Sequence, residues 1–289
     1  MEYLKSTSAR KAVQAIGDAA AGGAQSIDRA ATLLLLVGRA GPFGARLSEL
    51  VEQCDLSKPT VRRMLLALVR AGLLDQDPET RRYYIGPEIY VLGNIASARF
   101  GIHPISLRSL LRLSQETGDT AFLSVPRGTY SICVHREEGS YPIRVHALHA
   151  GDRHPLGIGA GSLALLSALP DDEVEQALAA NADILAEKYP QYSPPVLRAL
   201  VEESRAKGYA LNPGMMLPGS WAIGVSIRGL DGRPVGAISI AAIESRLGEE
   251  RQRELALLLT KEAAWIEIQL RRATGDERQL RARNGRLGI

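Results

Sequence analysis

Basic and hydroxyl side chains gather in residues 57–63, and groups of these kinds bind nucleic acids. Arginine and lysine form charge-assisted hydrogen bonds with phosphate, and arginine also makes paired hydrogen bonds with the edge of guanine. Serine and threonine hydroxyls can contact either a base or a phosphate. The candidate residues for such contacts are Ser57, Lys58, Pro59, Thr60, Arg62 and Arg63. They can act together only if one element presents them on a free surface.

The element that would present them is the second helix of a pair, within residues 47–72. Ser57 is predicted to cap this helix through its hydroxyl, and proline is tolerated in a first turn, whose amides have no helical partner. Val61, Leu65 and Leu68 recur at the spacing of one buried stripe, which leaves the arginines on the opposite side. This layout is typical of a DNA-binding helix-turn-helix. It is equally compatible with two helices whose arginines are simply solvated.

A β-hairpin is predicted directly after this helix. Residues 73–74 and 82–86 have strand-like composition, and the segment DQDPETR between them is rich in residues that favour turns. A hairpin in this place forms the wing of a winged helix-turn-helix, where it can reach phosphate or the minor groove. The candidate wing contacts are Arg81, Arg82 and Tyr84.

The second half of the chain predicts a domain that mixes strands with helices. Strand-like segments at 120–125, 130–137 and 141–148 precede helices at about 160–168, 171–180 and 194–207. Two further strands, 221–229 and 234–243, are joined by Leu-Asp-Gly-Arg, a strong hairpin pattern, and a long amphipathic helix follows at 247–271. Strands framed by helices at both ends are typical of α/β sensor domains.

One helix start and one strand face in this half could bind an anion. In GIGAGSLALL the glycines leave the amides of Ala160, Gly161 and Ser162 unobstructed at a helix N-terminus, where the helix dipole favours a carboxylate. The strand pair that follows presents small side chains on one face, including Ala222 and Ser239. Such a face either receives a tightly packed helix or leaves room for a small molecule. The sequence leaves both alternatives open.

Clustered histidines raise an alternative, because histidine is a common metal ligand. Four of them lie within twenty residues: His135, His146, His149 and His154. On a strand, however, His146 and His149 point to opposite faces, and no cysteine or carboxylate stands at a ligand spacing beside them. Neither a G-x-S-x-G elbow nor a Cys–His motif is present. We therefore expect no cofactor, no bound metal and no enzymatic activity, with a metal sensor or an enzyme that uses these histidines as the alternative.

Length and composition bound these predictions. A chain of 289 residues, 45% of them hydrophobic, is long enough for two domains with separate cores. It has no apolar run of about 18 residues and no recognisable signal peptide, so we expect a cytoplasmic protein without a membrane partner. Cys54 and Cys133 make no disulfide framework. Residues 1–100 hold 13 Lys and Arg against 10 Asp and Glu, and residues 271–289 hold six Arg against two acids, which suits contact with a polyanion.

Several stretches together resemble the IclR family of bacterial transcription regulators. They are Ser26-Ile27-Asp28-Arg29-Ala30, LSKPTVRRMLLALVRAGLL and RYYIGPEIYVLG in the first half, and residues 151–169 and 207–246 in the second. The resemblance implies an α+β fold. Its expected parts are a flexible arm (1–25), a winged helix-turn-helix DNA-binding domain (26–86), a linker helix (87–101), an α/β effector-binding domain resembling GAF and PAS sensors (102–271) and a basic tail (272–289).

The resemblance also implies partners. Such a protein is expected to bind pseudo-palindromic operators on double-stranded DNA as a homodimer or homotetramer, with the linker helix in the dimer contact, and to answer a small organic acid as repressor or activator. Positions matching Ala160, Gly161, Asn212 and Ala222 line the family's effector pocket, and the patterns above add Ser162 and Ser239. Many relatives have Asp and Cys where this chain has Asn212 and Ala222. This favours an acid bulkier than a two- or three-carbon keto acid, such as an aromatic one.

Overall fold

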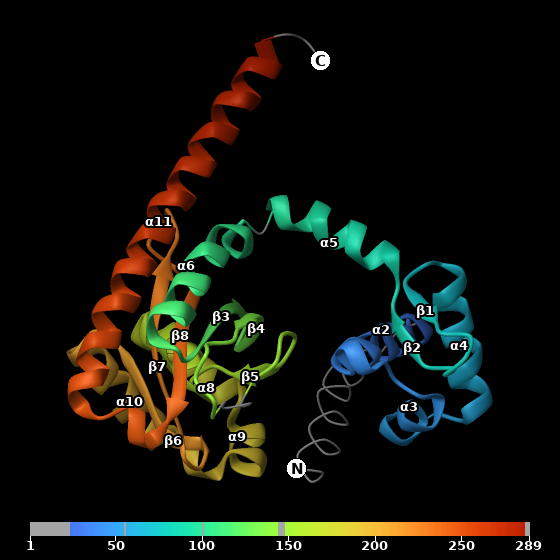
Figure 1. Cartoon of the computed structure of the whole chain (residues 1–289), viewed down its shortest axis with the longest axis horizontal. Coiled ribbons are helices and arrows are strands. Elements are labelled where there is room, and N and C mark those ends of the chain that lie inside the picture. Colours follow the sequence, from blue (N-terminus) through green and yellow to red (C-terminus); the bar gives the residue numbers. More distant parts are fainter. Residues whose placement is uncertain (1–23, 55, 100, 144–147, 287–289) are drawn as a thin grey trace. The chain divides into compact units, whose positions relative to one another are not determined.

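The computed structural model describes residues 24–54, 56–99, 101–143 and 148–286, with the backbone alone described at 97–99 and 274–286. The chain divides between residues 99 and 100 into two compact units (Figure 1). Each unit has hydrophobic clusters of its own, and these clusters share no residues.

The N-terminal unit is a winged helix-turn-helix. Its elements are α2 (Gln25–Arg39), η1 (Gly41–Phe43), α3 (Leu47–Gln53), α4 (Lys58–Arg70), β1 (Leu74–Gln76), β2 (Tyr83–Ile85) and α5 (Pro87–Arg99). Leu33, Leu50 and Leu65 bring α2, α3 and α4 together in one buried cluster. β1 and β2 pair antiparallel, and Ala45 forms a further bridge with Tyr83, so the loop before α3 joins the hairpin. The helix pair and the wing predicted from the sequence are confirmed.

Helix α4 forms where the sequence predicts it, because its apolar residues repeat on one face. Val61, Leu65 and Leu68 are all buried. Ser57 occupies the predicted N-cap position, but its hydroxyl pairs with the hydroxyl of Thr60 at 2.9 Å and bonds no backbone amide. The predicted start of the helix is therefore right, whereas the predicted side-chain cap is wrong.

The C-terminal unit is a six-stranded antiparallel sheet with helices on both faces. Its helices are α6 (Ile102–Thr117), α7 (Ala160–Ser167), α8 (Asp171–Ala180), α9 (Ala182–Lys188), η2 (Pro190–Tyr192), α10 (Pro194–Lys207), η3 (Glu244–Arg246) and α11 (Glu249–Arg286). Its strands are β3 (Thr120–Arg127), β4 (Tyr130–Glu137), β5 (Arg153–Pro155), β6 (Ala210–Leu217), β7 (Ser220–Arg228) and β8 (Pro234–Ile243). They lie in the order β5-β4-β3-β8-β7-β6. None of the described helices has the length and apolar character needed to cross a membrane.

Alternate residues of the central strands contribute to two separate clusters. On one face, Leu123 of β3 and Ile238 and Ile240 of β8 pack with α6 and α11, which lie side by side (Figure 1). On the other face, Ala237 of β8 packs with residues of α7, α8 and α10. The period of two along each strand produces this division. The α/β domain predicted from the sequence is confirmed.

Several element boundaries differ from those predicted. The strand expected at 141–148 is wrong in its described part, because 141–143 and 148 are not in a strand, and 144–147 lie outside the described residues. The outer neighbour of β4 is β5 instead. β6 and α9 are absent from the prediction. α11 continues to Arg286, so the tail expected from residue 272 begins inside this helix, and the expected arm lies outside the described residues up to residue 23.

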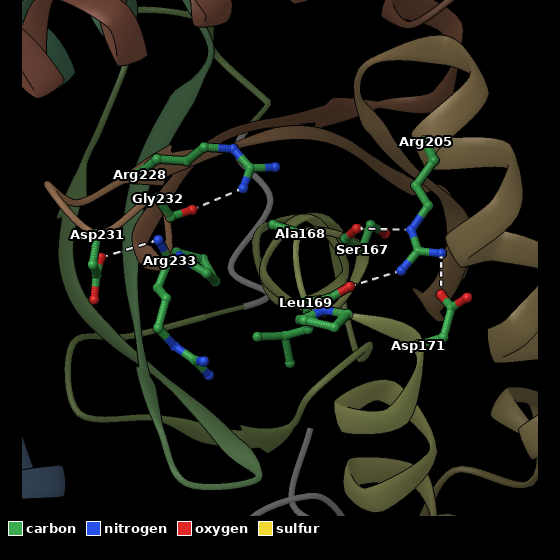
Figure 2. Close-up of a pocket in the computed structure, with 11 residues that line it drawn as sticks. Ser167, Ala168, Leu169, Asp171, Arg205, Arg228, Asp231, Gly232 and Arg233 are labelled. Atoms are coloured by element: carbon green, nitrogen blue, oxygen red, sulfur yellow. Dashed lines mark hydrogen bonds and ion pairs between the residues drawn. The ribbon is translucent and has the colours of Figure 1, made fainter.

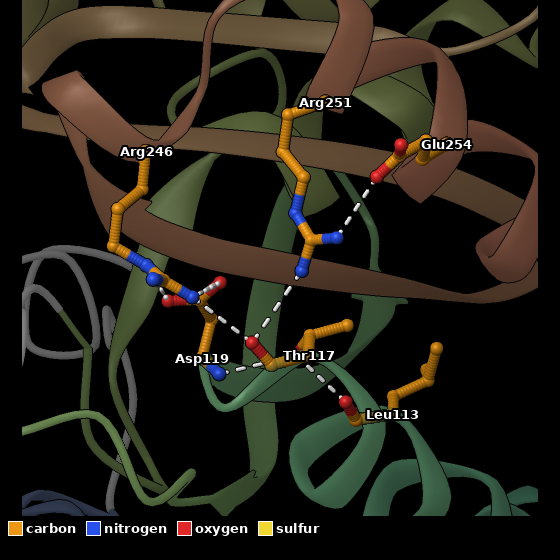
Figure 3. Close-up of polar contacts among 6 residues, drawn as sticks. All are labelled: Leu113, Thr117, Asp119, Arg246, Arg251 and Glu254. Atoms are coloured by element: carbon orange, nitrogen blue, oxygen red, sulfur yellow. Dashed lines mark hydrogen bonds and ion pairs between the residues drawn. The ribbon is translucent and has the colours of Figure 1, made fainter.

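A buried ion pair fixes the start of β3. Arg246 donates to both carboxylate oxygens of Asp119, at 2.9 and 3.0 Å, and to the carbonyl oxygen of Thr117 at 3.0 Å (Figure 3). The same guanidinium lies 3.9 Å from the ring centre of Tyr141. These hydrogen bonds, the one to Asp119 foremost, raise the pKa of Arg246. Because Asp119 is only 4% exposed, its charge needs this paired cation.

Candidate nucleic-acid interface and ligand pocket

The free side of α4 carries cations that have no partner in the described part of the chain. Lys58, Arg62 and Arg63 are exposed, and none of them forms an ion pair or side-chain hydrogen bond with another described residue. Pro59 is exposed beside them, and Thr60 is half-buried. The buried stripe fixes the rotation of the helix, so these side chains stay on its outer surface. The helix N-terminus adds a partial positive charge at the same place. The arrangement can bind a polyanion.

The turn of the wing is held by Asp77 and presents Arg81. Oδ1 of Asp77 accepts hydrogen bonds from the amides of Glu79 and Thr80 and from the Thr80 hydroxyl, at 2.6–3.0 Å. These bonds, with the Thr80 amide foremost, lower the pKa of Asp77. Arg81 has a φ of 58°, a left-handed conformation that is uncommon for residues other than glycine. Its side chain is exposed at the end of the hairpin.

Arg82 and Tyr84, the other two predicted wing contacts, join the wing to the loop before α3. Nη1 of Arg82 donates to the carbonyl oxygens of Phe43 and Gly44, at 3.2 and 2.8 Å, and lies 3.9 Å from a carboxylate oxygen of Glu49. The ring of Tyr84 packs on Gly44, where an added Cβ would lie 2.6 Å from it. The structure thus gives Arg82 an internal role that the sequence does not show.

The small-residue face of the sheet receives helix α7. A Cβ added at Gly224 of β7 would lie 2.8 Å from the carbonyl oxygen of Ala160, so the approach requires glycine. At Gly161 an added Cβ would meet the hydroxyls of Ser239 and Ser124, at 3.2 and 3.3 Å. Of the two alternatives that the sequence leaves open, a packed helix therefore holds at this end of the face. Ala160, Gly161 and Ser239 are brought together, as predicted.

The remaining predicted pocket residues are divided among neighbouring contacts. The Ser162 hydroxyl donates to the carbonyl oxygen of Pro155 at 3.1 Å, which ties the start of α7 to β5. Asn212 and Ala222 lie opposite each other on β6 and β7. Oδ1 of Asn212 accepts a hydrogen bond of 2.9 Å from the hydroxyl of Tyr192. Ala222 packs with a small apolar cluster formed by Phe122, Cys133, Leu148 and Ala241.

A small cavity lies beside the start of α7. Its volume is about 10 Å³, the space of roughly one water molecule. It is lined by Ser124, Ser131, Cys133, Leu148, His154, Ile158, Gly159, Gly161 and Ser162. Burial raises the pKa of the Cys133 thiol to about 12, so the sulfur carries its proton. Ser124, Ser131 and His154 are polar lining residues that the sequence analysis does not assign to a pocket. The pairing of Ser131 with His154 depends on β5, which has no clear pattern in the sequence.

The four histidines do not form one site in the structure. His135 hydrogen-bonds Glu137 at 3.2 Å, and His149 is exposed. His154 lines the small cavity, and His146 lies outside the described residues. Within the described ranges, no three His, Cys, Asp or Glu side chains gather closely enough to hold a metal ion. The metal-sensor alternative gains no support from this part of the chain.

A larger hollow of about 690 Å³ lies between the end of α7 and the β7–β8 hairpin, away from every predicted pocket residue. Figure 2 shows Arg205 turned toward the end of α7. It donates to the carbonyl oxygens of Ser167 and Leu169 and to Asp171, at 2.6–3.0 Å. Arg205 therefore satisfies backbone groups that a helix end leaves without partners. This explains its position without a ligand.

Two family descriptions match the sequence. "Bacterial transcriptional regulator IclR C-terminal" matches residues 96–268, and "IclR helix-turn-helix domain" matches residues 26–78. The chain belongs to the IclR family. Among curated IclR-type proteins, the HTH-type transcriptional regulator Rv1719 of Mycobacterium tuberculosis is 32% identical to it over 258 residues, which cover 86% of this chain and 95% of the relative.

Solved structures of IclR proteins share the fold. An IclR transcriptional regulator from Alicyclobacillus acidocaldarius has a TM-score of 0.71 at 23% identity, covering 86% of this chain and 100% of the other. An IclR homologue from Microbacterium hydrocarbonoxydans, complexed with 4-hydroxybenzoate, has a TM-score of 0.65 at 20% identity, covering 83% and 99%. The chain is an IclR-type DNA-binding transcription regulator, as its resemblance implies.

Proposed function

We propose that this IclR-family regulator binds a pseudo-palindromic operator on double-stranded DNA, with α4 in the major groove. The observation that carries the proposal is the set of exposed cations on α4, opposite its buried stripe. In this arrangement Arg62 and Arg63 contact base edges and nearby phosphates, Lys58 contacts phosphate, and Arg81 reaches DNA from the wing. Ser57, Pro59 and Thr60 lie at the point where the helix enters the groove, while Arg82 and Tyr84 position the wing.

The regulator acts as a homodimer or homotetramer in this proposal. α5 supports it, because apolar side chains on this helix remain exposed: Tyr90 is 74% exposed and Ile95 is 68% exposed, with Val91 and Leu92 beside them. Exposed apolar surface of this kind is typical of a contact with another chain. Two copies related by a two-fold axis would read half-sites about one helical turn apart.

The C-terminal unit binds a small organic acid, with aromatic acids the first to test. The acid's carboxylate would lie at the amides of Ala160, Gly161 and Ser162, and its remainder near Asn212, Ala222 and Ser239. The complex of the Microbacterium homologue with 4-hydroxybenzoate supports this class of ligand. Whether the acid relieves repression or promotes activation, a coupling of about 1–3 kcal/mol between the sites changes DNA affinity about 5- to 150-fold.

The regulator has no enzymatic activity in this proposal, and it works in the cytoplasm, where bacterial DNA lies. We hold this view because family members are transcription regulators. The described histidines also fail to converge with other ligand groups.

In-vitro selection from random DNA duplexes tests the proposal. The full-length protein should enrich inverted repeats with half-sites about one helical turn apart. Enrichment of no sequence, or of a single half-site only, would contradict it. Thermal denaturation with aromatic and aliphatic acids tests the ligand class on the same preparation, because a ligand that binds the native state at 100 times its Kd adds about 2.7 kcal/mol of stability.

A further inference from the structure

His154 is the polar group of the small cavity that the fold and the DNA-binding surface leave unexplained. The residue keeps some solvent exposure as a whole, but its Nε2 atom is buried and has no hydrogen-bond partner among the described residues. Buried polar atoms are nearly always hydrogen-bonded, so each exception needs an explanation. His154 lies on β5 opposite Ser131 of β4, and both line the cavity.

The other nitrogen of the ring determines what Nε2 can do. Nδ1 of His154 lies 3.0 Å from the hydroxyl oxygen of Tyr189. Burial raises the pKa of Tyr189 to about 12, so its hydroxyl keeps its proton, and burial lowers the pKa of His154, so the imidazole is neutral near pH 7. A phenol hydroxyl is a better donor than a neutral imidazole N–H, and an imidazole nitrogen is a better acceptor than a phenol oxygen. Tyr189 therefore donates to Nδ1, and the proton of the neutral ring lies on Nε2.

The cavity limits the partner of this donor to one atom. A volume of about 10 Å³ holds a single oxygen, and it does not hold a ring or a whole carboxylate. Ser124 and Ser131 line the same cavity and are each 4% exposed, and their hydroxyls can donate or accept. A hydroxyl or an oxo group is therefore the substituent that matches this surrounding. A methyl group of similar size would leave the Nε2–H donor unpaired.

We infer that His154 selects the effector, by donating a hydrogen bond from Nε2 to a hydroxyl or oxo oxygen that the acid carries in addition to its carboxylate. The inference rests on the proposed organic-acid effector and narrows it to hydroxy- and oxo-acids. His154 is a specificity-determining residue of the pocket, and Tyr189 is a positioning residue that keeps the Nε2–H form.

Two matched pairs of acids test this role on the full-length protein by calorimetry: 4-hydroxybenzoate with 4-methylbenzoate, and pyruvate with isobutyrate. The wild-type protein should bind the oxygen-bearing member of at least one pair about tenfold more tightly or better. His154→Leu should reduce this preference to about one, and His154→Gln, whose amide can donate from a similar position, should retain most of it. His149→Leu is the matched control, because it removes an exposed histidine from the same region.

The outcomes separate this inference from the proposed function. Acids that bind the wild type and His154→Leu with the same preference would overturn the role of His154 alone. No binding by any of the four acids would overturn it together with the organic-acid part of the proposal, while operator binding by the same preparation would still support the DNA-binding part. Nitrogen NMR of histidine-labelled protein needs no ligand: a proton on Nε2 is expected, and a proton on Nδ1 would overturn the inference.

Discussion

Arg81 and Arg82 are adjacent and equally basic, yet the structure assigns them different roles, and a matched pair of substitutions can separate them. Arg82→Ala removes the donor to the carbonyl oxygens of Phe43 and Gly44. A hydrogen bond from a charged donor contributes about 1.5–3 kcal/mol, and we count one bond because one nitrogen serves both acceptors. The side chain is 25% exposed, so solvent screening favours the lower end, about 1.5–2 kcal/mol.

Hydrogen exchange can measure this loss locally. The amides of Ala45 and Tyr83 bond each other's carbonyl oxygens at 2.9 and 2.8 Å, in the loop and strand that Arg82 joins. A loss of up to about 2 kcal/mol raises the open population of this bridge up to about 30-fold, and its exchange rises by the same factor. Arg81→Ala should leave the exchange unchanged and weaken DNA binding. Equal exchange in both variants, with equal loss of DNA affinity, would refute the assignment of Arg82 to the wing's internal support.

Three further predictions concern the C-terminal unit. Gly224→Val should push α7 from the sheet at Ala160 and lower the free energy of unfolding by about 1–3 kcal/mol, as overpacking does, in urea denaturation followed by tryptophan fluorescence. Asp119→Ala should cost about 3 kcal/mol in the same assay, because it leaves Arg246 without its buried counter-ion; a loss below about 1 kcal/mol would contradict this account. Cys133, whose thiol pKa is raised to about 12, should resist iodoacetamide at about pH 8 in the native protein and react after unfolding, as mass spectrometry can show.

Patterns that depend on local spacing were predictable from the sequence. Val61, Leu65 and Leu68 define the buried side of α4 by their repeat alone, and this fixes which side Arg62 and Arg63 occupy. The same holds for the β7–β8 hairpin and for the helices around it, since each follows from periodicity and turn residues within a short segment.

Features that depend on distant partners were not predictable. β6 contains Pro213 and Gly214 and forms through pairing with β7, and β5 has three residues. The sequence shows the charge of Arg82 but not the carbonyl oxygens, 38 and 39 residues away, that accept its hydrogen bonds. The sequence analysis groups His154 with the other histidines because it cannot show that a neighbouring strand and Tyr189 place this ring at a cavity.

The central claim is that the exposed face of α4 reads DNA, and operator affinity of two arginine variants tests it most directly. Arg63 and Arg70 are both exposed on α4, but Arg70 lies in its last turn. With a duplex obtained by selection, Arg63→Ala should lose specific binding, by about 1–3 kcal/mol or more per base contact, while its circular dichroism stays unchanged. Arg70→Ala should bind nearly as the wild type does. Unchanged affinity of Arg63→Ala for the selected duplex would contradict the account.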